Sequence, residues 1–199
     1  MSDKKTDILY NHYIDTYANA KERENLRNKL FLITVGLLGL ILLELTYSTD
    51  MVNAIKQINI LGININISVI PLPILISFTW TFFSILSVRY YQVTIHIDKL
   101  YLYIHGLEKK LSALMGENNI ISRESSGYLT KKFSIFRHCV WYYYTAIYPA
   151  IVIIVIIWSL ILESSIAIIP IYHKYYDFCL GLLSVGFLVF YLVGQWLEK

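Results

Sequence analysis

Hydrophobic residues in this chain gather in four long blocks, and most charged residues lie between them. The blocks are residues 30–47, 70–88, 145–162 and 178–197. A membrane-spanning helix needs about 20 mainly apolar residues, because the hydrocarbon core is about 30 Å thick and a helix rises about 1.5 Å per residue. The pattern therefore predicts four transmembrane helices.

Lysine and arginine are distributed unequally among the segments outside these blocks. Residues 1–29 contain six and residues 89–144 contain eight, whereas the loops 48–69 and 163–177 contain one each. Cytoplasmic loops of membrane proteins carry the excess of these residues. We therefore expect both termini and the central segment in the cytoplasm. The first block follows a charged stretch without a small-residue cleavage site, so we expect it to remain as an anchor in a bacterial inner membrane.

Residues 89–116 predict a helix that continues the second span into the cytosol. Their apolar positions recur at alternating steps of three and four, which is the pattern of a coiled-coil seam. The N-terminal segment 1–29 has similar spacing, so we expect the two to pack as a small cytosolic helical bundle. The seam either packs only within one chain or also joins subunits. Its residues are Tyr90, Val93, Ile97, Leu100, Ile104, Leu107, Leu111 and Leu114.

Two more segments outside the blocks carry structural patterns. In loop 48–69, isoleucines alternate with polar residues around a glycine, which favours a short extracytoplasmic β-hairpin. Residues 117–144 combine a polar loop with an interfacial helix, whose Lys131, Lys132 and Arg137 suit anionic lipid head groups. The expected fold class is an all-α membrane protein with four transmembrane helices, the cytosolic bundle and this hairpin.

The composition narrows the class of protein. Hydrophobic residues make up 56% of the chain and charged residues 16%. The charged fraction lies well below the roughly 25% of soluble domains, which excludes an ordinary soluble enzyme and a disordered chain. No cysteine or histidine cluster has metal-ligand spacing, and neither a phosphate-binding glycine loop nor a nucleophile elbow is present. We therefore expect no metal ion and no cofactor.

Acidic residues are nearly absent from the predicted spans, and those close to them lie at the ends. Glu44 and Glu163 lie at outer ends, and Asp177 lies close to the start of the fourth span. These acids are either solvated at the membrane interface or form an acidic ring at the outer mouth of an oligomeric pore, which would favour cations. No ionisable residue lies near the middle of a span, which counts against active transport.

Arg89 and His96 form a pair that resembles the arginine–spacer–histidine signature of HEPN ribonucleases. Residues seven apart on a helix lie on one face, two turns from each other. The resemblance implies a membrane-tethered ribonuclease that acts on RNA as a dimer. An arginine is also expected at the inner interface for topological reasons, so we do not expect an enzyme or a nucleic-acid partner.

The layout of residues 8–115 is similar to small membrane proteins of bacterial antiviral systems. The similarity lies in Tyr10, Tyr13, the run ERENLRN that leads into FLITVGLLGL, and Arg89-Tyr90 followed by LYLYIHGLEKKL. The layout of this region resembles SLATT-type effectors, RipA-like oligomeric membrane proteins and the membrane accessories of type VI CRISPR loci. The third and fourth spans depart from the two-span SLATT pattern. The number of spans is similar to that of the four-span membrane component of the Kiwa system. The resemblance implies a homo-oligomer that acts on the membrane during infection, and it identifies no site residue.

These observations favour a homo-oligomeric inner-membrane protein of a bacterial antiviral defence module. Its cytosolic bundle would be coupled to membrane perturbation or pore formation, and its partners would be membrane lipids and further copies of the chain. The main alternative is a membrane anchor or sensor that recruits a cytosolic defence protein encoded nearby. A passive channel or carrier without a defence role is a further alternative.

Overall fold

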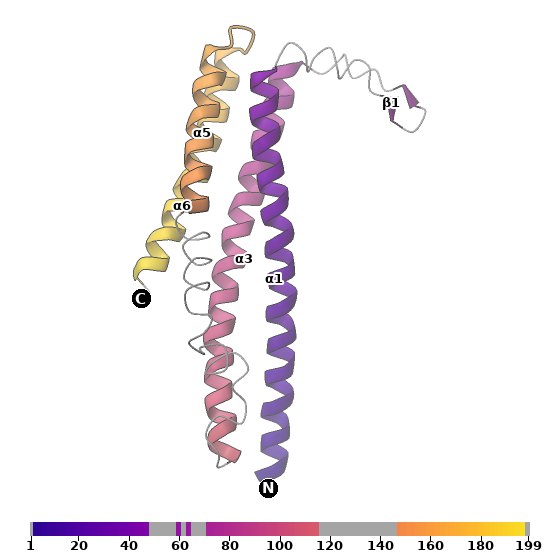
Figure 1. Cartoon of the computed structure of the whole chain (residues 1–199), viewed down its shortest axis with the longest axis vertical. Helices are drawn as coiled ribbons and strands as arrows, with labels where there is room; N and C mark the ends of the chain where they lie inside the picture. Colours follow the sequence, from indigo (N-terminus) through magenta and orange to yellow (C-terminus); the bar gives the residue numbers. More distant parts are fainter. Residues whose placement is uncertain (1, 48–58, 61–62, 65–70, 116–146, 198–199) are drawn as a thin grey trace. The chain divides into compact units, whose positions relative to one another are not determined.

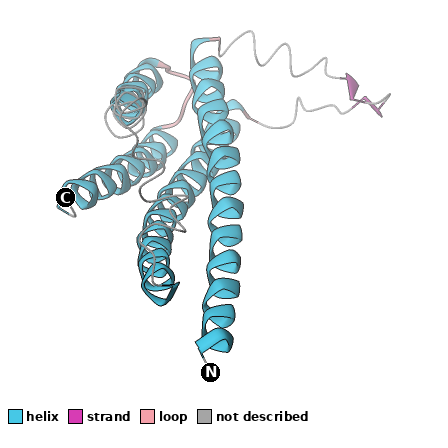
Figure 2. Ribbon diagram, turned by 60° about the horizontal axis from the view of Figure 1, so that its bottom comes forward, coloured by secondary structure: helices cyan, strands magenta, loops and turns pink. Residues whose placement is uncertain are grey.

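The computed structural model describes residues 2–47, 59–60, 63–64, 71–115 and 147–197 of the 199-residue chain. These residues form an all-helical fold with four long helices, apart from one pair of very short strands (Figures 1 and 2). The helices are α1 (Ser2–Thr46), α3 (Leu72–Met115), α5 (Tyr148–Ser165) and α6 (Ile171–Leu197). Each has the length and apolar character of a membrane span, which confirms the predicted number of apolar helices.

The chain is organised as two compact units. The first unit combines Met1–Lys29 with Gln92–Thr145, and the second combines Leu30–Tyr91 with Ala146–Lys199. The boundaries between the units fall within α1, after Lys29, and within α3, after Tyr91. Both helices are continuous there, so each contributes residues to both units. The long helix that the sequence predicts across the second span and residues 89–116 is thus α3.

The core of the first unit lies between α1 and α3. Tyr13 and Ala20 of α1 are buried together with Ile104, Leu107 and Leu111 of α3. The spacing of three and four residues places the last three on one face of α3, so α1 of the same chain covers this part of the seam. Outside this core, the seam residue Leu114 is 44% exposed.

The second unit contains an antiparallel pair of α1 and α3 segments and a helical hairpin of α5 and α6. The ring of Phe31 in α1 lies 6.3 Å from that of Tyr90 in α3. Helices α5 and α6 are joined by residues 166–170, and the Pro170 carbonyl accepts the backbone N–H of His173 in the first turn of α6. A proline is well suited to this position, because its fixed φ matches a helix start.

The predicted loop 163–177 is much shorter in the structure. Helix α5 continues to Ser165 and α6 begins at Ile171, not at residue 178. The prediction followed hydropathy alone, whereas the helices continue through polar residues until a proline interrupts them. Within the described residues, helix α5 begins at Tyr148. As a consequence, the acids of this region lie in helices.

The short strands are β1 (Asn59–Ile60) and β2 (Ile63–Asn64). They pair antiparallel, with Asn59 opposite Asn64 and Ile60 opposite Ile63. Two residues a strand do not establish a hairpin across loop 48–69, so the longer hairpin stays a prediction. The predicted interfacial helix with Lys131, Lys132 and Arg137 lies outside the described residues.

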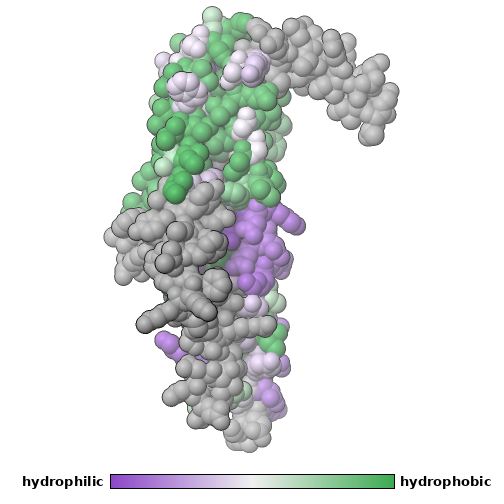
Figure 3. All heavy atoms as spheres, in the orientation of Figure 1, coloured by the Kyte–Doolittle hydropathy of each residue, from purple (hydrophilic) through white to green (hydrophobic). Residues whose placement is uncertain are grey.

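The second unit exposes large apolar side chains, whereas α1 is hydrophilic over part of the first unit (Figure 3). Leu32 is 69% exposed, Ile154 65% and Phe190 74%. An apolar surface of this extent is unfavourable in water and is typical of contact with lipid or protein. The exposed faces of the second unit therefore suit a bilayer.

Candidate functional site

Polar side chains from all four helices are buried inside the second unit. The three acids predicted at the outer ends of the spans are among them, since Glu44 and Glu163 are 1% exposed and Asp177 is fully buried. We call this group and its neighbours the polar cluster. Its members are Glu44 of α1, Ser77, Thr79 and Trp80 of α3, Glu163 of α5, and His173 and Asp177 of α6.

The acids are buried because they continue the inward-facing stripes of their helices. On α5, Glu163 follows Val152, Ile156 and Ser159 at steps of three and four, and all four are buried. Asp177 begins the equivalent stripe on α6. Positions with this spacing share one face of a helix, whatever their polarity. Each acid is therefore directed into the unit by the apolar residues that follow or precede it.

The best-defined part of the polar cluster is a chain of two hydrogen bonds. The Ser77 hydroxyl donates to Oδ2 of Asp177 at 3.0 Å. Its oxygen also lies 2.8 Å from Nδ1 of His173. Because a serine hydroxyl has a single hydrogen, which points to Asp177 here, the His173 bond requires Nδ1–H as the donor. The order is thus imidazole, hydroxyl, carboxylate, from a half-buried side chain to a fully buried one.

This order differs from that of a nucleophilic triad. In such triads the histidine lies between serine and acid, and it accepts the serine proton. Here Ser77 lies in the middle and donates to Asp177, so the serine is not activated for attack. The arrangement is instead suited to holding or passing a proton, because a hydroxyl can accept one hydrogen bond and donate another.

The other two acids are close to the same place. The Thr79 hydroxyl lies 3.1 Å from Oε1 of Glu44 and donates to it. Asp177 interacts electrostatically with both Glu44 and Glu163. Within the described residues, Oε2 of Glu44, both carboxyl oxygens of Glu163, Oδ1 of Asp177 and Nε1 of Trp80 are buried without a hydrogen-bond partner.

Positive charge near these acids is limited. The charge of His173 acts on Asp177, and that of Lys174 acts on Glu163. The Lys174 ammonium group is itself held at the carbonyl of Ser164, at 2.9 Å. A buried carboxylate is unfavourable unless it is paired and hydrogen-bonded, so three acids in one cluster need more positive charge than these residues supply.

A hollow of about 310 Å³ between α5 and α6 lies beside the polar cluster. Its lining includes Glu163 and Lys174, together with the apolar side chains of Leu160, Ile171 and Phe178. The hollow is large enough for several water molecules, each of which occupies about 30 Å³ in the liquid.

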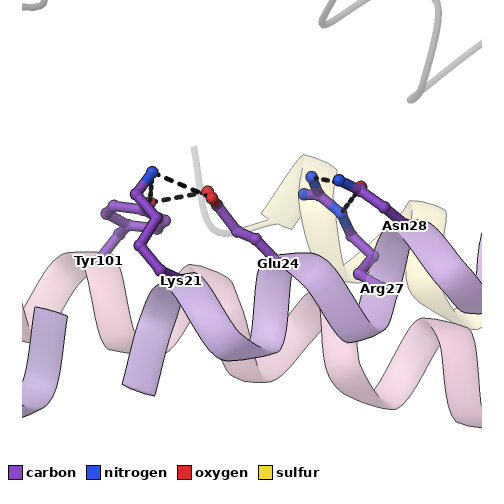
Figure 4. Close-up of polar contacts among 5 residues, drawn as sticks. All are labelled: Lys21, Glu24, Arg27, Asn28 and Tyr101. Atoms are coloured by element: carbon purple, nitrogen blue, oxygen red, sulfur yellow. Dashed lines mark hydrogen bonds and ion pairs between the residues drawn. The ribbon is translucent and has the colours of Figure 1, made fainter. Parts of the chain in front are cut away.

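A second polar site, in the first unit, joins α1 to α3 outside the predicted spans (Figure 4). Nζ of Lys21 lies 3.0 Å from Oε2 of Glu24. The Tyr101 hydroxyl donates to Oε1 of Glu24 at 2.7 Å, and Lys21 reaches the same hydroxyl at 3.4 Å. On the next turn of α1, Arg27 donates to the Asn28 side chain.

These contacts change the acidity of the three side chains. Partial burial opposes ionisation of Glu24, but hydrogen bonds from Tyr101 and Lys21 outweigh it and place its pKa below the ordinary 4.5. Burial and the bond to Glu24 raise the pKa of Tyr101 to about 12. Burial works against the charge of Lys21, yet its bond to Glu24 raises the pKa above the ordinary lysine range. The site is thus stable as a charged pair with a neutral phenol.

The remaining predicted site residues are placed as follows. Arg89 and His96 are both exposed on α3, with Arg89 in the second unit and His96 in the first. Burial of the seam is nearly complete, with Leu100 only partly buried and Leu114 exposed. The buried seam residues are Tyr90, Val93, Ile97, Ile104, Leu107 and Leu111.

Sequence reasoning identified the acids but missed the hydroxyl and imidazole members of the polar cluster. Hydropathy does not single out Ser77 and Thr79, because hydroxyl groups are common in transmembrane helices, and it places His173 in a loop. The usable signal is register, since Ser77 and Trp80 lie three apart on the buried side of α3.

No protein-family model, no curated protein sequence and no solved structure matches the chain. The four helices that are long and apolar enough to cross a membrane indicate a multi-pass membrane protein.

Proposed function

We propose that this chain is a homo-oligomeric inner-membrane protein of a bacterial antiviral defence module, whose first unit receives a signal and whose spans then permeabilise the membrane to small cations. The first unit lies on the cytoplasmic side in this proposal, as the distribution of lysine and arginine predicts. The defence role is taken from the resemblance of residues 8–115 to SLATT-type and related proteins.

The observation that carries the proposal is the continuity of two helices. Helix α1 extends over 45 residues and α3 over 44, and each passes from the first unit into the second without a break. A rigid helix can transmit a shift at one end to the other, because packed helices move as bodies. A change in the packing of Tyr13 against the buried residues of α3 would thus move the membrane-spanning parts of both helices.

The polar cluster supports cation permeation as the output. Buried ionisable residues in a membrane segment are unfavourable and commonly mark an ion pathway. The three acids make this part of the second unit attractive to positive charge. Further copies of the chain would be needed to enclose a pathway, and the exposed apolar faces of the spans provide contact surface for them.

The test is a flux measurement on the full chain in liposomes that contain a fluorescent cation indicator. Wild-type protein should produce cation entry after addition of an extract from phage-infected cells, and an Asp177→Asn variant should reduce it. Overexpression in cells should depolarise the inner membrane. Intact vesicles with every extract, combined with a normal membrane potential in overexpressing cells, would refute the proposal.

One observation favours an anchor that recruits a cytosolic effector. The first unit exposes apolar side chains on both helices, with Ile8 63%, Leu102 68% and Tyr103 49% exposed. A stoichiometric soluble partner, recovered by pull-down and lost in a Leu102→Ser variant, would favour this function over permeabilisation.

A further inference from the structure

The polar cluster contains an internal route that permeation alone does not require. His173 is half-buried, whereas Asp177 and Glu163 are almost completely inaccessible. The Ser77 hydroxyl is the link, at 2.8 Å from the imidazole and 3.0 Å from the carboxylate. A hydrogen-bonded chain of this kind connects a half-buried side chain in the first turn of α6 to the fully buried carboxyl group of Asp177.

The cluster also contains a buried donor that is not an acid. Trp80 is fully buried, and its Nε1–H lies close to the carboxyl group of Glu163 without good hydrogen-bond geometry. The same carboxyl group interacts with Asp177, so the indole N–H adds a polar group to the buried end of the route.

We propose that the polar cluster is a proton-exchange site, in which a proton enters at His173 and is delivered through the Ser77 hydroxyl to Asp177. The Nδ1 proton of the imidazolium moves to the Ser77 oxygen as the hydroxyl proton moves to Oδ2 of Asp177. The products are a neutral imidazole with its proton on Nε2, an unchanged hydroxyl and a neutral carboxyl group. Electrostatic contact then couples Asp177 to Glu163 and Glu44.

A proton fits this site better than a metal ion. No group of three or more acidic, histidine or cysteine side chains in the described residues is arranged to hold a metal. A proton needs no coordination shell, and it neutralises a carboxylate at the point where burial makes its charge unfavourable. The charged groups that face the site are Glu44 from α1, Glu163 from α5, and His173 and Lys174 from α6, while α3 contributes only neutral groups.

Proton exchange does not itself depend on membrane permeabilisation. Its consequence does rest on the proposed function, because the permeating cation would then be the proton. The two proposals are distinguished by measuring protonation and flux separately on the same reconstituted protein.

The first experiment is infrared difference spectroscopy of the full chain in liposomes after a rapid change of pH. Wild-type protein should show the carbonyl band of a buried carboxylic acid that appears on acidification, and Asp177→Asn should remove or shift it. Ser77→Ala should keep the band at equilibrium but slow its appearance by at least about tenfold, because the relay is broken. His173→Gln should slow it as well.

Ser84→Ala is the matched control. Ser84 is a buried serine on α3 that bonds to Ser184, outside the polar cluster. It should leave the rate unchanged, and the far-ultraviolet circular dichroism of all variants verifies folding. A wild-type protein without a pH-dependent carboxyl band, or equal rates in wild type and both the Ser77 and His173 variants, would overturn the proposal. A pH-dependent carboxyl band that is slowed in the Ser77 and His173 variants, without ion flux through the protein, would support the proton-exchange site and contradict permeabilisation.

Discussion

At the scale of single residues, the contact between α5 and α6 depends on one glycine. A Cβ atom added at Gly181 would lie 3.2 Å from Cδ1 of Leu160 and 3.4 Å from Cγ2 of Ile156. Small residues allow transmembrane helices to approach this closely, and packing replaces the hydrophobic effect as the source of their affinity. Gly186, further along the same helix, has open space at the equivalent position.

We predict that Gly181→Leu destabilises the second unit by about 1–3 kcal/mol, because overpacking forces the helices apart. Gly186→Leu should leave stability almost unchanged. Thermal unfolding in detergent, followed by circular dichroism, measures both. An equal loss of stability in the two variants would mean that α5 and α6 do not pack as described.

The Lys21–Glu24–Tyr101 site gives a prediction on pH dependence. The pKa of Glu24 is lower in the folded protein than its ordinary 4.5, so the carboxylate stabilises the fold above that value and the contribution is lost as the pH falls through the lowered pKa. The site is partly exposed, so Glu24→Gln should cost only about 0.5 kcal/mol at neutral pH.

This difference between wild type and Glu24→Gln should vanish in acid. Glu22→Gln, at an exposed position of the same helix, should have no effect at any pH. Denaturant unfolding of the full chain in micelles across the acidic range measures the difference. A difference that persists below the pKa of Glu24 would show that lost packing, not lost charge, is responsible.

Residue environments were the least predictable level of this structure. The sequence predicted Glu44 and Glu163 at the outer ends of spans, where they would be solvated or form the mouth of an oligomeric pore. In the structure, both side chains are buried by other parts of the same chain. Hydropathy cannot tell these cases apart, because it counts how apolar a segment is and not which side faces a neighbour. The helical register of the surrounding apolar residues contains this information, but only once the neighbouring helices are known.

At the scale of elements, the sequence predicted the helices well because their signals are long and periodic. The sequence predicted one continuous helix from the second span through residues 89–116, and helix α3 extends over Leu72–Met115. The ends of α5 and α6 were less accurate, since helix ends are set by single residues such as Pro170.

In the proposed function, a signal passes from the first unit to the spans through the unbroken helix α3. Gln92 is exposed at the start of the α3 segment that belongs to the first unit. A proline there removes one backbone hydrogen bond and costs about 3 kcal/mol in helix stability. We predict that Gln92→Pro abolishes triggered cation flux in liposomes, whereas the thermal stability of the second unit remains. Gln92→Ala, which keeps the helix, should retain flux, and full flux in Gln92→Pro would contradict transmission through α3.

At the scale of the whole molecule, two antiparallel pairs determine the topology. In the second unit α1 and α3 run antiparallel, since Phe31 lies beside Tyr90 and Glu44 beside Thr79. The Leu30 end of the α1 segment and the Tyr91 end of the α3 segment therefore lie at the same end of this pair. The connection 166–170 must lie at one end of the α5–α6 hairpin. Lysine and arginine then predict which side is the cytoplasm.

Cysteine labelling of intact cells tests this topology. Cys139 and Cys179 are first replaced by alanine, which leaves a chain without cysteine. Ile168 is 68% exposed in the α5–α6 connection, so Ile168→Cys should react with a membrane-impermeant maleimide added outside. Asn25→Cys, at an exposed position of α1 in the first unit, should react only after the membrane is permeabilised. The reverse pattern would place the first unit outside the cell, where no cytosolic signal could reach it, and the proposed function would fail with it.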